Sequence, residues 1–180
     1  LLETREEHIP RHGVMQGNTD SGDNHASVLL VGATPMDARV ISCGLKREDI
    51  SMDIAADVRT VIDRLTTMCE DETTVASSCL VAIDFTTAPA DGLTVLNAIR
   101  ASPRLQTLPA IALVNHTVAP DEAKERIQSA YEHGVNGHIS GASDIETYAD
   151  AIQEFAAFWF SQVSLPPQSL YSDSATISYD

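Results

Sequence analysis

The 180-residue chain has few basic residues and very few lysines. Eleven lysines and arginines stand against 26 aspartates and glutamates, so the formal net charge is −15. Lys46 and Lys124 are the only lysines in the sequence. Without a broad basic face, a protein is poorly suited to nucleic acids and to anionic membrane surfaces. We therefore expect neither a nucleic acid nor a membrane among its partners.

The excess of carboxylates together with the scarcity of lysine is typical of proteins that work at molar salt. The Debye length there falls to about 3 Å, so neighbouring carboxylates repel one another little while their hydration keeps the protein soluble. An acidic protein from an ordinary cytosol is the alternative. On composition alone we favour a halophilic origin.

Cysteines and long apolar runs are scarce too. Cys43, Cys69 and Cys79 show no CxxC spacing, and we expect small buried thiols in a reducing compartment. No apolar run approaches the roughly 20 residues that span a bilayer. The hydrophobic fraction of 43% is ordinary for a globular protein. We expect a cytoplasmic protein that holds no metal ion.

Both ends of the chain differ from its central part. Residues 1–26 are polar and carry no sustained apolar period, so we predict a flexible amino-terminal arm. Residues 164–180 are rich in proline and serine, and we predict a flexible tail there. The segment 27–163 between them has the size of one globular domain.

Within this domain, short apolar runs alternate with amphipathic segments. The apolar runs predict strands, which cover residues 27–31, 50–55, 79–83, 110–114 and 137–140. The apolar spacing between them predicts helices, which begin at Pro35 behind the N-cap Thr34, near Val58, at Asp91, at Asp121 and behind the N-cap Asp144.

Five strand–helix units in succession predict an α/β fold, a doubly wound parallel sheet of five strands with helices on both faces. Ligand sites of such sheets lie at the carboxyl ends of the strands. Asp84 stands at the end of the third strand. The sequence contains neither GxGxxG nor GxxxxGK[ST], which weighs against dinucleotide and Walker-type nucleotide binding.

Four segments, in order and at matching intervals, resemble response-regulator receiver domains. They are SVLLVGATPMDARVI, CLVAIDFTTAPADGLTVLNAIR, SPRLQTLPAIALV and AYEHGVNGHISGASDIETYADAI. The resemblance covers about residues 27–163 and implies the five-stranded, five-helix flavodoxin-like receiver fold. The ending EFAAFWFSQVSLPP resembles that of stand-alone regulators that partner phytochromes.

The resemblance also implies a phosphorylation site, and this sequence departs from it. Receivers transfer a phosphoryl group to a strand-end aspartate, matched here by Asp84. The two acidic residues with which receivers hold Mg²⁺ are matched in this sequence by Gly32 and Ala33. A hydroxyl residue is matched by Val114, and a lysine by Gly141. Four of the five positions have therefore lost the side chains that support this transfer.

We therefore expect a degenerate receiver of the pseudo-receiver type, in which transfer is absent or feeble. It would signal by protein–protein contact, with a sensor histidine kinase or a second copy as partner, and would be neither an enzyme nor a cofactor-dependent protein. One alternative is a phosphorylation-dependent receiver that uses Mg²⁺ and Asp84. Another is a small-ligand sensor, if Gly32, Ala33 and Gly141 open a pocket.

Asp84 and His138 each allow two interpretations. Asp84 is either a residual phospho-acceptor or a strand-end aspartate that hydrogen-bonds the next loop, and we favour the second. His138 matches the aromatic switch position of the family. We favour simple packing at the sheet edge over a pH-sensitive element.

The last helix is predicted to carry its core stripe through Ile145, Tyr148, Ile152 and Trp159. Phe158 and Phe160 would then point away from the core. Exposed aromatic side chains often mark an interface. We predict a partner or dimer face there, with coverage by the carboxyl-terminal tail as the alternative.

Overall fold

The computed structural model describes residues 26–46, 48, 50–70, 79–103, 105–141 and 144–163. Residues 1–25 of the predicted arm, and the predicted tail 164–180, lie outside this part. Strands and helices alternate along the described chain. They are β1 (Ser27–Val31), α1 (Pro35–Lys46), β2 (Ser51–Ala55), α2 (Val58–Glu70), β3 (Cys79–Asp84), α3 (Pro89–Ala101), β4 (Ala110–Val114), α4 (Pro120–Glu132), β5 (Gly137–Ser140), α5 (Ile145–Ala157) and the π-helix η1 (Phe158–Gln162).

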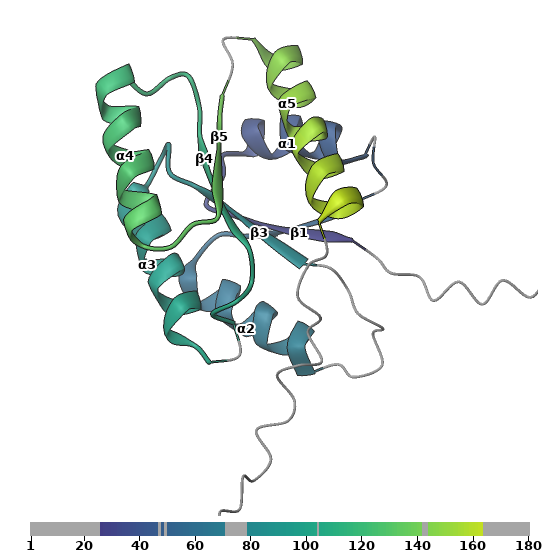
Figure 1. The fold of residues 1–180 in the computed structure, drawn as a ribbon, viewed down its shortest axis with the longest axis vertical. Helices are drawn as coiled ribbons and strands as arrows, with labels where there is room; N and C mark the ends of the chain where they lie inside the picture. Colours follow the sequence, from purple (N-terminus) through teal and green to yellow (C-terminus); the bar gives the residue numbers. More distant parts are fainter. Residues whose placement is uncertain are drawn as a thin grey trace, which may run out of the picture.

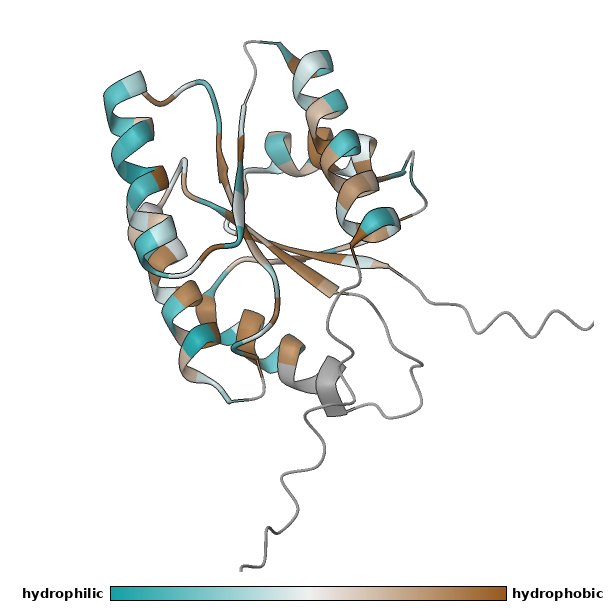
Figure 2. Cartoon of the chain, viewed as in Figure 1, coloured by the Kyte–Doolittle hydropathy of each residue, from teal (hydrophilic) through white to brown (hydrophobic). Residues whose placement is uncertain are grey.

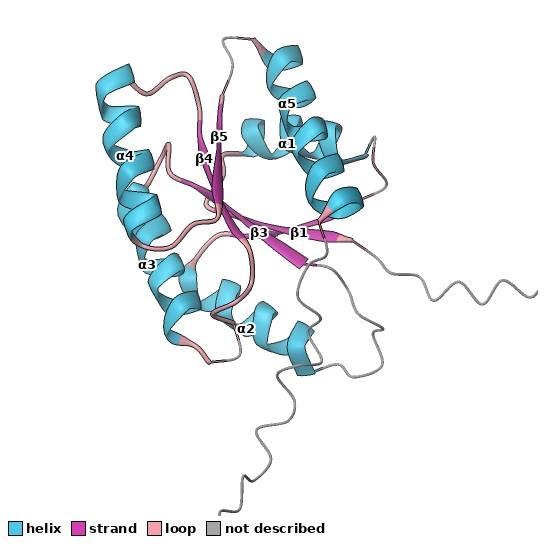
Figure 3. Ribbon diagram, viewed as in Figure 1, coloured by secondary structure: helices cyan, strands magenta, loops and turns pink. Residues whose placement is uncertain are grey.

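The five strands form one parallel sheet in the order β2-β1-β3-β4-β5. Helices α2, α3 and α4 cover one face of this sheet, and α1 and α5 cover the other (Figures 1 and 3). The predicted doubly wound α/β fold is thereby confirmed. The chain reverses its direction of winding between β1 and β3, so the carboxyl ends of these two strands flank the switch point.

Side chains of the central strands are buried on both faces of the sheet. Leu29 and Val31 of β1 enter the cluster beneath α2 and α3, whereas Val28 and Leu30 enter the cluster beneath α1 and α5. Figure 2 shows the same distribution, with hydrophobic strands enclosed by helices whose outer faces are hydrophilic. Continuous apolar runs are what a parallel sheet buried on both faces requires.

Helix ends follow the capping signals in the sequence. The Thr34 hydroxyl accepts a hydrogen bond from the Asp37 N–H at 3.2 Å, and Asp144 accepts one from the Thr147 N–H at 2.8 Å. Both predicted N-caps are therefore confirmed. Gly134, with φ of 95°, follows α4 in the left-handed conformation that terminates helices.

Three sequence-based predictions about individual residues are wrong. Helix α3 begins at Pro89 rather than Asp91, because proline is favoured in the first helical turn. Ile145 is exposed, since the first residue of α5 projects beyond the sheet. Cys43 is exposed because it lies on the outer side of α1, whereas Cys79 is buried as expected.

Arg100 ties the end of α3 to the amino-terminal edge of the sheet. Its guanidinium donates to the Gly134 carbonyl at 2.7 and 3.0 Å and to the Leu108 carbonyl at 2.8 Å. It also donates to the Asn136 side-chain oxygen, which in turn accepts from the Ala110 N–H at 2.9 Å. Burial lowers the pKa of Arg100 below its usual value. One side chain thus fixes the turns that precede both β4 and β5.

We predict that Arg100→Met lowers the free energy of unfolding by about 1–3 kcal/mol, because several carbonyls lose a charged donor. Urea denaturation measures the change. Arg39→Met, at an exposed position of α1, is the matched control and should alter stability by less than about 0.5 kcal/mol. Equal stability of Arg100→Met and wild type would contradict the structural role of this arginine.

Gly44 marks the closest approach of α1 and α5. A Cβ atom at this position would lie 2.7 Å from the Ala149 carbonyl oxygen and 2.9 Å from Ile152 Cγ2. We predict that Gly44→Ala destabilises the protein by about 1–3 kcal/mol through overpacking, although alanine favours helix formation. Cys43→Ala on the outer side of α1 is the control. A Gly44→Ala variant at least as stable as that control in thermal unfolding would refute the close contact.

Candidate functional site

Residues matched to the receiver site meet at the carboxyl edge of the sheet. Asp84 ends β3, Gly32 follows β1, Val114 ends β4 and Gly141 follows β5. Parallel pairing aligns these strand ends, and the Gly141 N–H donates to the Val114 carbonyl at 2.7 Å. The structure therefore brings together the residues that the sequence predicted at this edge.

The carboxylate of Asp84 is engaged by the loop that follows it. Its Oδ1 accepts from the Thr86 N–H at 2.7 Å, and its Oδ2 accepts from the Thr87 hydroxyl at 3.0 Å. Asp84 is only 5% exposed, which makes it the one charged residue that is buried in the described part of the chain. Hydrogen bonds to the following loop are what we expect if Asp84 is a strand-end aspartate with a structural role.

The loop after β3 is itself fastened to α4. Arg126 donates from Nη1 to the Phe85 carbonyl at 2.8 Å and to the Thr86 carbonyl. The Asn115 N–H, after β4, donates to the Thr86 hydroxyl oxygen at 2.9 Å. Arg126 also pairs with Glu122 one turn earlier on α4. Sequence reasoning missed Arg126, because no local pattern distinguishes a helical arginine that reaches a distant loop.

Space left by the missing acidic residues remains beside Gly32. Gly32 adopts φ of 74°, and a Cβ atom there would come no closer than 4.0 Å to Asp84. A cavity of about 230 Å³ lies next to it, with the carboxylates of Asp57 and Asp91 also in its lining. Asp57 caps α2 through the N–H and hydroxyl of Thr60, and these bonds lower the pKa of Asp57.

Gly141 leaves no comparable space. A Cβ atom at Gly141 would lie 2.6 Å from Asn115 Cα and 2.9 Å from the His116 nitrogen. The loop after β4 therefore occupies the volume that a longer side chain would need. Ala33 is half-buried and packs against the cluster beneath α1 and α5. Of the three positions that a small-ligand sensor would use, Gly32 therefore borders a cavity, whereas the loop after β4 closes the space beside Gly141.

At the two positions matched to the acidic residues of receivers, this edge offers no side-chain oxygen to a Mg²⁺ ion. Mg²⁺ prefers one or two available carboxylates in octahedral geometry. Gly32 and Ala33 carry no side-chain oxygen, so the other carboxylates near Asp84 are those of Asp57 and Asp91 in the cavity beside Gly32. In the ranges that the structure describes, no three His, Cys, Asp or Glu side chains cluster closely enough to hold a metal ion.

His138 lies away from Asp84, on the edge strand β5. Its imidazole packs edge-on against Tyr131 of α4, with ring centroids 5.8 Å apart and 3.1 Å between Nδ1 and the tyrosine oxygen. His138 is exposed, whereas Val114 is buried at the end of β4. This arrangement agrees with the predicted packing at the sheet edge.

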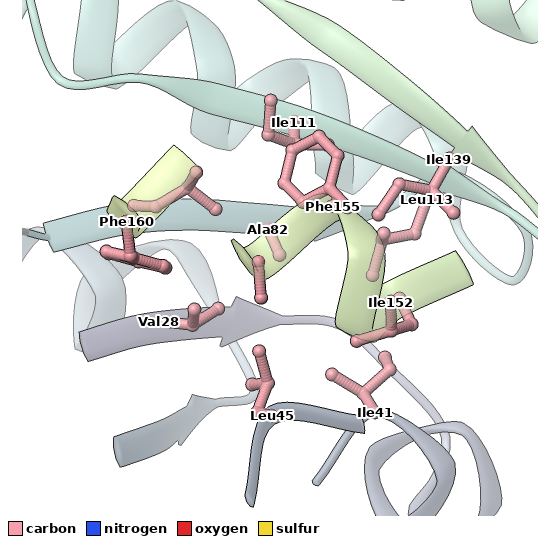
Figure 4. Close-up of a pocket in the computed structure, with 12 residues that line it drawn as sticks. Val28, Ile41, Leu45, Ala82, Ile111, Leu113, Ile139, Ile152, Phe155 and Phe160 are labelled. Carbon is pink, nitrogen blue, oxygen red and sulfur yellow. The ribbon is translucent and has the colours of Figure 1, made fainter. Parts of the chain in front are cut away.

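The aromatic residues at the end of α5 occupy two different environments. Phe158 is 49% exposed, as predicted. Phe160 instead packs on the core, because it lies four residues after the buried Ala156 and the π-helix keeps it on the same side. Figure 4 shows Phe155 and Phe160 at a small, wholly apolar cavity of about 20 Å³, which is no larger than a water site. The prediction that Phe160 points outward is wrong.

No helix in the described ranges has the length and apolar character needed to cross a bilayer. No family model and no curated protein matches the sequence.

Solved structures of similar shape are response regulators. RPA3017, a response regulator in red light signalling of R. palustris, is 24% identical, with a TM-score of 0.61, 78% of this chain covered and 98% of that one. The phosphorylated cyanobacterial phytochrome response regulator RcpA is 24% identical, with a TM-score of 0.61 and coverage of 79% and 99%. The Mn²⁺-bound response regulator Rcp1 is 24% identical, with a TM-score of 0.59 and coverage of 78% and 99%. The chain therefore has the five-stranded, flavodoxin-like fold of response-regulator receiver domains.

Proposed function

We propose that this chain is a single-domain signalling protein of the pseudo-receiver type, which acts through protein–protein contact. In this proposal it performs no Mg²⁺-dependent phosphotransfer and is not an enzyme. The observation that carries the proposal is that Gly32, Ala33 and Gly141 offer Asp84 neither a further oxygen ligand nor a cation, while the loop holds its carboxylate through Thr86 and Thr87.

The electrostatics of this edge support the proposal. A carboxylate that attacks a phosphoryl group must overcome the repulsion of like charges, and positive charge nearby normally supplies the compensation. Here the guanidinium of Arg126 directs its donors to the carbonyls of Phe85 and Thr86 and to Glu122. Gly141, where the family has lysine, carries no charge. The site therefore offers Asp84 hydrogen bonds but little cationic help.

A phosphorylation-dependent receiver is the second candidate function. Asp84 stands at the end of β3, the strand next to the switch point, and structures of this fold include a phosphorylated regulator and one that holds Mn²⁺. In that case Mg²⁺ would assist and a sensor histidine kinase would supply the phosphoryl group.

The proposed partners are proteins, either a sensor histidine kinase or a second copy of this chain, in the cytoplasm. The half-exposed Phe158 at the end of α5 is the residue that we assign to such a contact. Exposed aromatic side chains are enriched at interfaces relative to the remaining surface. The net charge of −15 argues against nucleic acid in this role.

Intact-mass measurement after incubation with acetyl phosphate and Mg²⁺ tests the phosphotransfer part of the proposal. We expect no adduct, because the carboxylate lacks a metal site and a neighbouring cation. A phosphoryl group would add about 80 Da and new charge. An adduct that forms on wild type and is absent from Asp84→Asn would establish the second candidate instead. An active receiver treated in parallel serves as the positive control.

We also propose that the acidic surface is an adaptation to high salt. Raising KCl from about 0.1 to about 1 M shortens the Debye length from about 10 to about 3 Å and weakens repulsion among the carboxylates. The thermal unfolding midpoint should therefore rise across this range. Sorbitol at matched osmolality separates screening from solute exclusion. A midpoint that stays constant or falls with KCl would refute the adaptation.

A further inference from the structure

A second and larger cavity, of about 550 Å³, lies above the carboxyl edge on the side of α1 and α5. The loops after β1, β3, β4 and β5 all contribute to it, through Thr34, Thr86, Asn115 and Asp144 respectively. Its volume falls within the range of roughly 300–1,000 Å³ that is usual for small-molecule sites. Asp84 is absent from its lining, but Thr86 and Thr87, which hydrogen-bond Asp84, belong to it.

Tyr148 of α5 reaches this cavity with an unpaired hydroxyl. The residue is only 6% exposed, yet no hydrogen bond joins its side chain to any part of the protein that the structure describes. Among the described side-chain polar atoms, only Ser27 Oγ is both shielded from solvent and unpaired. The unpaired Tyr148 hydroxyl is therefore in contact with solvent, within the cavity that the residue lines. Buried polar groups normally have a partner. This hydroxyl is therefore available to a bound molecule.

The protonation state of the Tyr148 hydroxyl determines which hydrogen bonds it can form with a ligand. Burial, together with the carboxylates of Asp37 and Asp84, raises the pKa of Tyr148 well above its usual value. The phenol therefore stays protonated at all physiological pH values and presents a hydrogen-bond donor. The neutral phenol can also accept, so an N–H group of a ligand can bind its oxygen.

The remaining polar lining is negatively charged. Asp37 and Asp144 contribute carboxylates, and no lysine or arginine of the described residues lines the cavity. Asp37 accepts through Oδ2 from the Thr34 hydroxyl at 2.7 Å, and Asp144 accepts from Thr147. His116 is the one ionisable group of basic type in the lining. Such a cavity repels phosphate and other anions and attracts cations.

Apolar side chains provide a further wall. Met36 and Ile145 are each 61% exposed, and both lie in the lining together with the buried Val40. Large exposed apolar residues are unfavourable in water unless another molecule covers them. A short alkyl chain fits this wall, while a guanidinium or ammonium group at its end fits the carboxylates.

We propose that this cavity, bounded by the beginnings of α1 and α5, binds a small organic cation that joins an amine or guanidinium group to a short alkyl chain. Asp37 and Asp144 would accept from the cationic group, and so would the oxygen of the protonated Tyr148 phenol. The ligand would touch Thr86, whose N–H holds Asp84, and so provide an input to the receiver edge. This site does not depend on the proposed pseudo-receiver function.

Titration of the ¹⁵N-labelled full chain with agmatine, followed by NMR, tests the site. Measurements use the lowest KCl concentration at which circular dichroism shows the native fold. We expect saturable shifts at the amides of Thr34, Asp37, Thr86, Asn115 and Tyr148. Glutarate, an anion of similar length, should shift none of them. No saturable shift with agmatine or putrescine up to about 50 mM, or an equal response to glutarate, would overturn the proposal.

Three variants test which side chains contribute to the binding of agmatine. Tyr148→Phe removes an unpaired hydroxyl and keeps the ring, so it should fold and weaken agmatine binding about fivefold. Asp37→Asn retains an acceptor for Thr34 and should weaken binding at least about tenfold. Glu146→Gln neutralises an exposed carboxylate outside the lining and should change the Kd less than about twofold. Unchanged binding in the first two variants, or an equal loss in all three, would overturn the site.

Discussion

A parallel sheet that is buried on both faces can present polar groups only where its strands end. In this protein Asp84 is the one buried charged residue of the described chain, and it lies at such an end. Burial of a carboxylate is costly unless hydrogen bonds replace the lost water. The Thr86 N–H and the Thr87 hydroxyl supply these bonds. The conformation of the loop after β3 therefore depends on Asp84 as much as Asp84 depends on the loop.

The neighbouring elements reinforce this arrangement. Arg126 holds the carbonyls of the same loop from α4, and Asn115 donates to the Thr86 hydroxyl oxygen. Asn115 in turn lies against Gly141, where a side chain would collide with it. A glycine at position 141 and the close approach of the β4–α4 loop therefore go together. Hydrogen bonds between neighbouring loops thus hold this edge of the sheet together.

Local signals explain why much of the fold could be predicted from the sequence. The bounds of β4 and β5 agree with their apolar runs, and Thr34 and Asp144 cap their helices as expected. These features depend on residues that are close in the chain. Convergence of Asp84, Gly32, Val114 and Gly141 followed from strand order, which the resemblance to a known fold provided.

Contacts between distant residues could not be predicted in this way. Arg126 reaches Phe85 across 41 positions, and the Asn115 backbone fills the space beside Gly141. Phe160 turns inward because the chain continues as a π-helix, which no apolar period signals. The unpaired hydroxyl of Tyr148 was likewise invisible, since helical spacing showed only that the residue faces the core.

The most direct test of the proposed pseudo-receiver function is the response of the Asp84 edge to a divalent cation. Mn²⁺ broadens the NMR signals of nuclei near its binding site, and molar KCl suppresses its diffuse attraction to the acidic surface. The absence of side-chain oxygens at Gly32 and Ala33 predicts no selective broadening at the amides of Gly32, Asp84 and Thr86. Selective, saturable loss of these signals at low Mn²⁺ would contradict the proposal and favour a working phosphorylation site.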